Sequence, residues 1–322
     1  MVNFHYAFRC LTADVVMNFC FQSDLGALAS PGFRNTTLET FVEGTEMAMV
    51  PFHFPSFFAL VTKVIFALPD KVRKEKFAGV HGFQMMQALA RARVEDAIAR
   101  AKGEKRDSGK VAGRENADEE KTLTMFDLML RPDVSKGQIS PSENDMVADG
   151  CLMIAAGTDT TANTLGTVLF HVTQNPSIEA KLLQELKHRI GKDEIVDSAS
   201  LEGKGFEYLR AVVKEGLRLS YGVPGRILRK VPKEGARFGD VHVPGGVSLR
   251  IFISCVKPED SLTVQQITIT SSIYLQNADA ETFPDPFKFD PERWLCDFEM
   301  YRLRDRQMLS FSRGSRSCVG IK

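Results

Sequence analysis

The chain has 322 residues, of which 43% are hydrophobic, so it is long enough to bury a large core. Lysine and arginine together number 41, and aspartate and glutamate also number 41. This balance lacks the basic excess of proteins that bind nucleic acid. The cysteines, at positions 10, 20, 151, 255, 296 and 318, form no CxxC pair and no disulfide-like spacing. The composition therefore predicts a globular enzyme of a reducing compartment with unpaired thiols.

The first part of the chain is predicted to be mainly helical. Apolar residues recur at helical spacing over residues 8–21, and a second helix is predicted over 33–49. The aromatic stretch 52–69 contains a proline, a histidine and a lysine, which argue against a membrane span. A charged amphipathic helix is predicted over 71–102. The polar run 103–121 is predicted to be a solvated loop.

One long helix is predicted from Pro141 to Gln174. Ser140 provides an N-cap, Pro141 the first helical position and Glu143 the capping-box carboxylate. Asn175-Pro176 is predicted to end the helix. The run is apolar enough to suggest a membrane span, but its aspartates and threonines would be costly in hydrocarbon. A buried central helix is therefore favoured.

The centre of this helix carries a glycine and polar side chains that could take part in a reaction. Gly157 and the hydroxyls of Thr160 and Thr161 weaken the helix locally and can open its hydrogen-bond ladder to a water or to O2. Asp159 lies beside them in the sequence. These residues form the first candidate site.

A second helical stretch, 208–219, places Glu215 and Arg218 on one face, because they are three residues apart. Alone, such a pair is an ordinary surface pair that contributes a few tenths of a kcal/mol. A proline-stiffened, irregular segment, 283–294, follows later and contains Arg293.

Between these motifs, helix 178–190 is predicted to end at Gly191, and strands are predicted at 226–231, 238–243 and 267–274. Arg229 lies in the first of these strands. The Arg229 side chain could lie in solvent at the edge of the strand, without a binding role.

The chain ends with the pattern F-x-x-G-x-R-x-C-x-G, which runs from Phe311 to Gly320 around Cys318. Gly314 and Gly320 lack a Cβ, so the backbone can approach a flat ligand closely. Arg316, within the pattern, has a forked, permanently charged group that suits a carboxylate. A lone cysteine is usually core, but five matched positions favour a thiolate that ligates haem iron.

These motifs, in this order, resemble those of the cytochrome P450 monooxygenases. The resemblance implies a mainly α fold with small β-sheets, in one domain over residues 1–322. It implies haem b with Cys318 as the axial ligand and Phe311 beside the ring. The other expected cofactor-binding residues are Arg316, Gly314, Gly320, Arg229, Ala156 and Gly157.

The resemblance also assigns roles outside the cysteine loop. Asp159 and Thr160 match the acid-alcohol pair that delivers protons to oxygen bound at the iron. Arg293 is expected to join Glu215 and Arg218 in a buried network that fixes the core carrying the loop. A haem-thiolate isomerase or dehydratase would have little need for the acid-alcohol pair, so the pair favours oxygenation.

The early segment, around Phe8 to Val16, resembles fungal microsomal members of the trichodiene oxygenase type. The implied reaction hydroxylates an apolar small molecule with O2 and two electrons from NADPH-cytochrome P450 reductase, in secondary metabolism. The implied location of the full-length form is the endoplasmic reticulum membrane, on the cytoplasmic face. Stretch 52–69 is then either core or a helix pair that touches the bilayer.

Three departures from the family pattern bear on whether the chain is an active enzyme. The family's membrane anchor and first helices would precede Met1, and the helix after Cys318 has only four residues here. Residues 247–266 have no family counterpart and are either a translated intron or a surface loop, which sequencing of the cDNA would distinguish. The alternative to an active enzyme is thus a catalytically inactive fragment, from a pseudogene or a faulty gene model.

Overall fold

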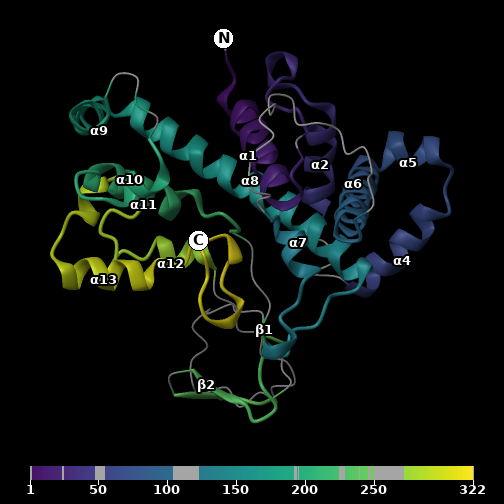
Figure 1. The fold of residues 1–322 in the computed structure, drawn as a ribbon. Helices are drawn as coiled ribbons and strands as arrows, with labels where there is room; N and C mark the ends of the chain where they lie inside the picture. Colours follow the sequence, from purple (N-terminus) through teal and green to yellow (C-terminus); the bar gives the residue numbers. More distant parts are fainter. Residues whose placement is uncertain are drawn as a thin grey trace. The chain divides into compact units, whose positions relative to one another are not determined.

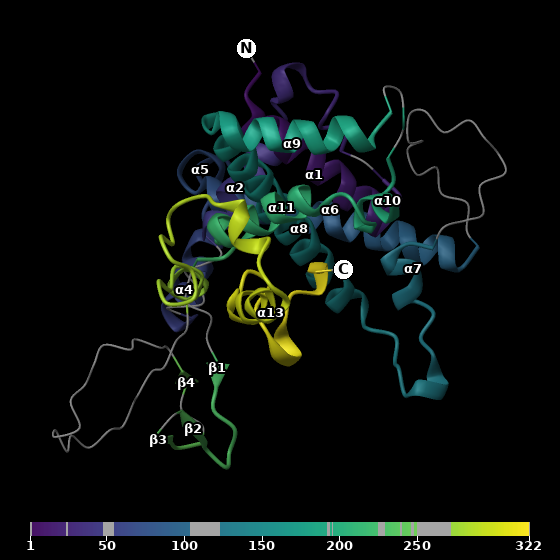
Figure 2. The same ribbon diagram turned by 90° about the vertical axis from the view of Figure 1, so that its left-hand side faces the viewer.

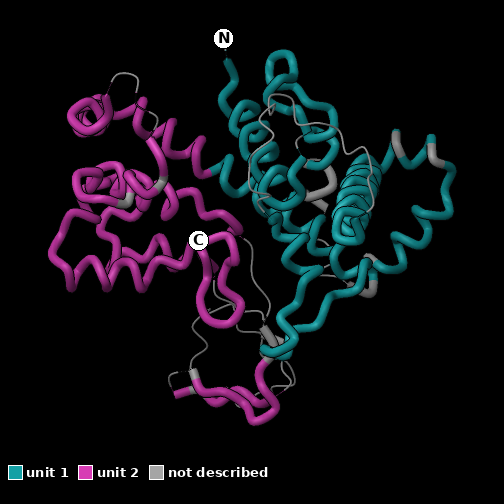
Figure 3. The backbone as a smooth tube through the Cα atoms, viewed as in Figure 1, with its two compact units in different colours: residues 1–163 teal, residues 164–322 magenta. Residues whose placement is uncertain are grey.

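The structure of the chain is a computed structural model, and most of its regular elements are helices (Figure 1). It describes residues 2–23, 25–47, 55–103, 123–191, 194, 196–224, 229–238, 240–245, 248–249 and 272–321. The chain divides into two compact units, residues 1–163 and 164–322 (Figure 3). The predicted mainly helical fold with small sheets is confirmed.

The first unit consists of helices that lead up to the longest one. Its elements are α1 (Phe4–Phe21), the 3-10 turn η1 (Pro31–Phe33), α2 (Thr36–Met47), α4 (Pro55–Phe66), α5 (Asp70–Lys76), α6 (Ala78–Ala101), α7 (Met125–Met129), the 3-10 turn η2 (Val134–Lys136) and the first part of α8 (Glu143–Gln174). The helix predicted over 71–102 is in fact two, because Phe77 has a non-helical backbone (φ −133°, ψ 52°) that separates α5 from α6. The helix predicted over 33–49 begins only at Thr36, after η1.

The N-terminus of α8 differs from the prediction by two residues. The helix starts at Glu143 rather than Pro141, and Ser142 takes the N-cap position predicted for Ser140. The Ser142 hydroxyl accepts a hydrogen bond from the backbone N–H of Asp145 at 3.2 Å and donates one to the Asp145 carboxylate at 2.6 Å. Asp145 thus has the role expected of Glu143, because it is the acid three residues after the actual cap. The predicted end at Gln174 is confirmed.

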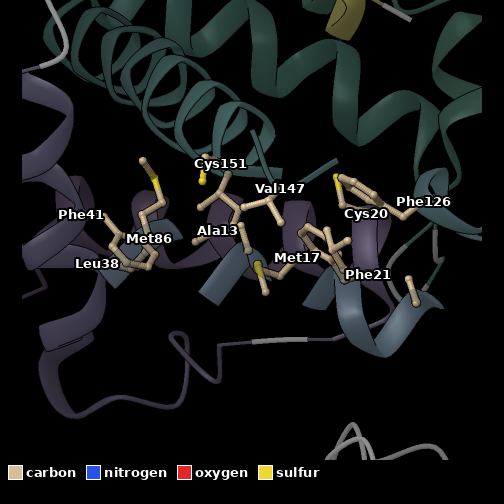
Figure 4. Close-up of a cluster of buried hydrophobic side chains, with 14 of the residues drawn as sticks. Ala13, Met17, Cys20, Phe21, Leu38, Phe41, Met86, Phe126, Val147 and Cys151 are labelled. Carbon is tan, nitrogen blue, oxygen red and sulfur yellow. The ribbon is translucent and has the colours of Figure 1, made fainter. Parts of the chain in front are cut away.

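The core of the first unit forms where one face of α1 meets α6, α7 and α8 (Figure 4). Ala13, Met17, Cys20 and Phe21 recur along α1 at helical spacing and are almost fully buried. The Phe21 ring stacks on Phe126 of α7, with ring centroids 4.6 Å apart. The same core includes Met146, Val147, Cys151 and Ile154, so it holds α1 against the first half of α8.

The second unit carries the rest of α8 and the C-terminal segments. Its elements are α9 (Pro176–Arg189), α10 (Ser198–Glu202), α11 (Glu207–Ser220), β1 (Arg229–Lys230), β2 (Ala236–Phe238), β3 (Val241–Val243), β4 (Ser248–Leu249), α12 (Ile273–Asn277), the 3-10 turn η3 (Pro291–Trp294), α13 (Phe298–Gln307), and the 3-10 turns η4 (Gly314–Arg316) and η5 (Val319–Ile321). Three small clusters of buried apolar residues lie among the described residues of this unit. One centres on Val212 and Phe289, the second on Phe283 and Trp294, and the third on Val231 and Val243.

The strands are shorter than predicted and pair in two antiparallel ribbons, β1 with β4 and β2 with β3 (Figure 2). Segment 238–243 is not one strand: it is the turn and second arm of the β2–β3 hairpin, in which Phe238 pairs with Val241. The strand predicted over 267–274 is wrong where the structure describes it, because Ile273 and Tyr274 begin α12. Residues 267–271 lie outside the described residues.

Two further expectations concern the membrane and the insertion. Among the described residues, no helix is long and apolar enough to cross a bilayer. Of the proposed insertion 247–266, the structure describes only Ser248 and Leu249, which form β4. The origin of the insertion therefore stays a prediction.

Candidate functional site

A buried cluster of charged side chains joins α11 to the segment that leads into η3. Glu215 and Arg218 have no exposed surface, and Arg293 is 7% exposed. Arg218 donates from Nε to Glu215 Oε2 at 2.9 Å and from Nη2 to Oε1 at 2.8 Å. Arg293 donates from Nε to Glu215 Oε1 at 2.9 Å. The structure thus brings into contact the three side chains that the family resemblance joined.

The Glu215 carboxylate has two further donors that sequence reasoning missed. Trp294 donates from Nε1 to Oε2 at 2.9 Å, and the backbone N–H of Asp290 donates to Oε1 at 3.0 Å. Burial by itself raises the pKa of Glu215. The hydrogen bond and charge of Arg218, with the charge of Arg293, outweigh burial and hold this pKa below its usual value. Glu215 is therefore a buried carboxylate that stays ionised.

Asn277, at the end of α12, links this cluster to the start of the cysteine loop. Its side chain is fully buried. Its Nδ2 donates to the carbonyl of Arg218 at 3.1 Å and to Ser310 Oγ at 3.0 Å. Its Oδ1 accepts from the backbone N–H of Leu309 at 2.9 Å. The loop is therefore anchored to α11 immediately before it begins, a connection that no local pattern in the sequence indicates.

The loop that carries Cys318 is closed by backbone hydrogen bonds and presents its thiol outward. The Cys318 N–H donates to the carbonyl of Phe311 at 2.8 Å, and the Ser317 N–H donates to the carbonyl of Gly314 at 3.0 Å. Gly314 has φ of +80°, a conformation that favours glycine. A Cβ at Gly320 would lie 3.7 Å from Cys318 Sγ, so the second glycine leaves the space beside the sulfur open. Cys318 is exposed and not in a disulfide.

Of the two arginines predicted to bind a carboxylate, the structure describes the side chain of Arg316 only. Arg316 belongs to η4 and is exposed, two residues before the cysteine. The backbone of Arg229 belongs to β1, but its side chain lies outside what the structure describes. The η5 turn begins at Val319, directly after the thiol.

The candidate proton-delivery residues lie in the part of α8 that belongs to the first unit. The Thr160 hydroxyl donates to the carbonyl of Ala156 at 2.7 Å, one turn earlier. Asp159 forms an ion pair with Arg9 of α1, with 3.0 Å between Nε and Oδ1. Sequence reasoning missed Arg9, because the two residues are far apart in the chain and belong to different helices.

Gly157 allows α1 to approach α8 closely. A Cβ added at this position would lie 2.5 Å from Cγ2 of Val16. Valine is stiff at χ1, so its methyl group cannot easily move away. The structure thus gives Gly157 a packing role on the α1 side of the helix, in addition to the haem contact that the resemblance implies for it.

We expect Gly157→Ala to lower the free energy of unfolding by about 1 to 2 kcal/mol, because overpacking outweighs the helix-propensity gain of alanine. Chemical denaturation measures the change. Val16→Ala in the same chain should relieve the clash. Gly166→Ala is the matched control, since nothing lies within 4 Å of its Cβ position. Equal effects of the two glycine substitutions would contradict the packing role.

Comparison with known proteins identifies the family of this chain. The model of the family described as Cytochrome P450 matches residues 2–261 and 265–322. The chain belongs to the cytochrome P450 family. It is 30% identical over 319 residues to the cytochrome P450 monooxygenase aneF of Aspergillus aculeatus, covering 97% of this chain and 55% of that protein. It is 27% identical to the monooxygenase MO6277 of Ascocoryne sarcoides, covering 99% of this chain and 56% of that protein.

Solved structures show the same fold. A crystal structure of the cytochrome P450 CYP102L1 matches with a TM-score of 0.65 at 15% identity, covering 99% of this chain and 61% of that chain. The heme domain of a cytochrome P450DA mutant matches with a TM-score of 0.67 at 14% identity, covering 99% and 57%. The chain spans about half the length of the curated relatives it matches. The family match makes the chain an enzyme by family, a member of a group of haem-dependent monooxygenases.

The cysteine loop fits the group that this family binds. A thiolate is a ligand for haem iron, and Cys318 offers its sulfur on an exposed loop. The glycine beside the sulfur leaves room for a flat macrocycle. The residues present are therefore compatible with haem ligated at Cys318.

Proposed function

We propose that this protein is a haem-thiolate monooxygenase that hydroxylates an apolar small molecule in fungal secondary metabolism. The observation that carries the proposal is the outward-facing thiol of Cys318, on a loop tied through Asn277 to the buried Glu215 cluster. Such an anchor suits a ligand that must hold one position during turnover. The relatives named as monooxygenases support the same reaction.

In this proposal Cys318 Sγ holds the haem b iron, Arg316 binds a propionate and Phe311 packs beside the ring. The remaining contacts are assigned to Gly314, Gly320, Arg229, Ala156 and Gly157. When bound, the haem supplies activation of O2 and insertion of one oxygen atom into a C–H bond.

The protein's own contribution is the proton path. Thr160 holds a hydroxyl on the α8 surface, bonded to the Ala156 carbonyl, and Asp159 lies next to it with its carboxylate paired to Arg9. We assign to Asp159 the transfer of protons and to Thr160 their positioning. A carboxylate and a hydroxyl are both groups that can take part in proton transfer.

We also propose a redox partner and a cellular location for the full-length protein. The electrons come from NADPH-cytochrome P450 reductase, and the full-length protein is associated with the cytoplasmic face of the endoplasmic reticulum. The two units belong to one P450 domain, as the family match over both of them supports.

The test uses the full-length protein with haem, reductase, NADPH and a cyclic terpene hydrocarbon as the apolar probe. Under 18O2, the product should gain one labelled oxygen. An isomer of the probe formed without O2 would favour an isomerase instead, and loss of water from a hydroxylated terpene without O2 would favour a dehydratase.

Asp159→Asn and Thr160→Ala should each leave haem content unchanged and lower the fraction of NADPH electrons that reach product by about tenfold or more, because each removes a group of the proton path. Product and peroxide yields per NADPH measure this coupling. Unchanged coupling in both variants would assign the pair a structural role.

A further inference from the structure

Two serine hydroxyls from different segments bind one carbonyl at the end of α11. The Leu217 carbonyl is one of the last four of this helix, which have no partner within it. Ser220 Oγ donates to this carbonyl at 3.3 Å, and Ser310 Oγ, at the start of the cysteine loop, donates to it at 2.7 Å. A carbonyl oxygen has two lone pairs, so it can accept both hydrogen bonds. The Leu217 carbonyl thus joins α11 to the cysteine loop.

Each of the two serine hydroxyls also accepts a hydrogen bond. Thr164 Oγ1, on the part of α8 that belongs to the second unit, donates to Ser220 Oγ at 3.0 Å. Asn277 Nδ2 donates to Ser310 Oγ at 3.0 Å. On both sides the donors therefore point toward the same carbonyl. Hydrogen bonds in such a chain strengthen one another, so the hydroxyls are held more firmly than isolated ones.

The packing of α11 against α8 brings Thr164 and Ser220 within reach of each other. A Cβ at Gly216 would clash with Cγ2 of Val168, so the two helices approach closely there because the glycine has no side chain. Val168 lies one turn after Thr164, and Gly216 lies one turn before Ser220. The two contacts are thus one turn apart along both helices, as antiparallel neighbours require.

Ser310 lies next to the residue that closes the cysteine loop. The carbonyl of Phe311 accepts a hydrogen bond from the backbone N–H of Cys318 at 2.8 Å. On the other side of Ser310, the backbone N–H of Leu309 donates to Asn277 Oδ1 at 2.9 Å. A displacement of Ser310 would therefore move the backbone that carries the thiol.

We propose that Ser220 and Ser310 are positioning residues that hold the cysteine loop at a fixed place relative to α8. Thr164 provides the contact on α8, and the Leu217 carbonyl connects the two hydroxyls. None of these hydrogen bonds involves the Glu215 carboxylate, so the connection is separate from the buried charge cluster. It follows that a change at Thr164 should alter the loop through Ser220.

The first test needs neither haem nor activity and measures deuterium exchange at the Leu309 amide of the full-length protein. This rate reports the bond to Asn277 at the start of the loop. Ser310→Ala should raise the rate about tenfold, because the hydrogen bonds of the hydroxyl are lost, and Ser310→Thr should restore most of the protection. Ser315→Ala, at an exposed serine of the same loop, is the matched control. Equal exchange in Ser310→Ala and Ser315→Ala would overturn the positioning role.

The second test makes the change on α8. Thr164→Val removes the hydroxyl that donates to Ser220 and should raise the Leu309 exchange rate about two- to threefold, since it acts on the loop indirectly. In a Ser220→Ala chain, Thr164→Val should add nothing further, because the connection is already broken. Thr173→Val is the matched control, since the exposed Thr173 hydroxyl donates to carbonyls of its own helix. Equal exchange in Thr164→Val and Thr173→Val would refute the connection to α8.

The consequence for the haem ligand rests on the proposed function. In the enzyme loaded with haem, Ser310→Ala should release haem to apomyoglobin about five to ten times faster than wild type and lower the fraction of the reduced, CO-bound state that shows the thiolate band. Ser315→Ala should match wild type in both measurements. A release rate and a thiolate fraction equal to wild type in Ser310→Ala would refute the positioning of the ligand. Survival of the thiolate band in Cys318→Ala would instead refute the ligand assignment, and amide exchange would still decide whether the connection exists.

Discussion

Cys318→Ala in the full-length protein is expected to abolish stoichiometric haem binding and the absorption band that a thiolate ligand gives to the reduced, CO-bound state. The sulfur is the iron ligand in the proposed site, and residues 311–320 contain no second cysteine that could replace it. The Cys318 side chain is exposed and so adds little to the packing of the described residues. The variant should therefore keep its helical circular dichroism, and the change should be confined to the haem spectrum.

Two matched variants make the Cys318 prediction specific. Cys296→Ala removes a half-buried thiol of the same unit and should leave the thiolate band intact. Cys318→His keeps a ligand for iron but not a thiolate, so bound haem without the thiolate band is expected. Survival of that band in Cys318→Ala would show that another residue ligates the iron.

The sequence predicts the helices of this protein well where apolar spacing is regular and a strong end signal is present. The segment 8–21 lies within α1, and Asn175-Pro176 ends α8. Boundaries are less certain where two cap signals lie close together. Ser140 and Ser142 each have an acid three residues later, and the backbone uses the second.

Tertiary contacts explain the elements that the sequence misplaced. β-branched residues predicted a strand up to Tyr274, but the described part of that segment is α12. Its last residue, Asn277, makes buried hydrogen bonds to the backbone of Arg218 and Leu309. These partners are distant in sequence, so local propensity carries no information about them.

The same limit applies to the candidate site. The cysteine pattern and the spacing of Glu215 and Arg218 are local, so they can be read from the chain. The ion pair between Arg9 and Asp159 joins two helices that are far apart in sequence. The Trp294 hydrogen bond to Glu215 likewise depends on how an irregular segment packs against α11. Contacts of this kind follow from the folded arrangement alone.

Glu215→Gln is expected to lower the free energy of unfolding by about 3 to 5 kcal/mol, because it leaves two buried guanidinium groups without their counter-charge. Arg218 has no exposed surface and Arg293 is 7% exposed, so water cannot replace the carboxylate. Denaturation of the full-length protein by urea measures the loss. Glu207→Gln is the matched control, since Glu207 pairs with Arg210 at the same three-residue spacing on the same helix but is exposed.

The Glu215 contribution should also depend on pH, with a sign that follows from its lowered pKa. Folding favours the ionised carboxylate, so the stabilisation is fully present above the unfolded value of 4.5 and is lost as the pH falls through the lower folded value. Wild type and Glu215→Gln should thus differ most near neutral pH and converge in acid, whereas Glu207→Gln should stay close to wild type near neutral pH. A Glu215→Gln chain as stable as the Glu207→Gln control near neutral pH would mean that the buried cluster does not depend on this charge.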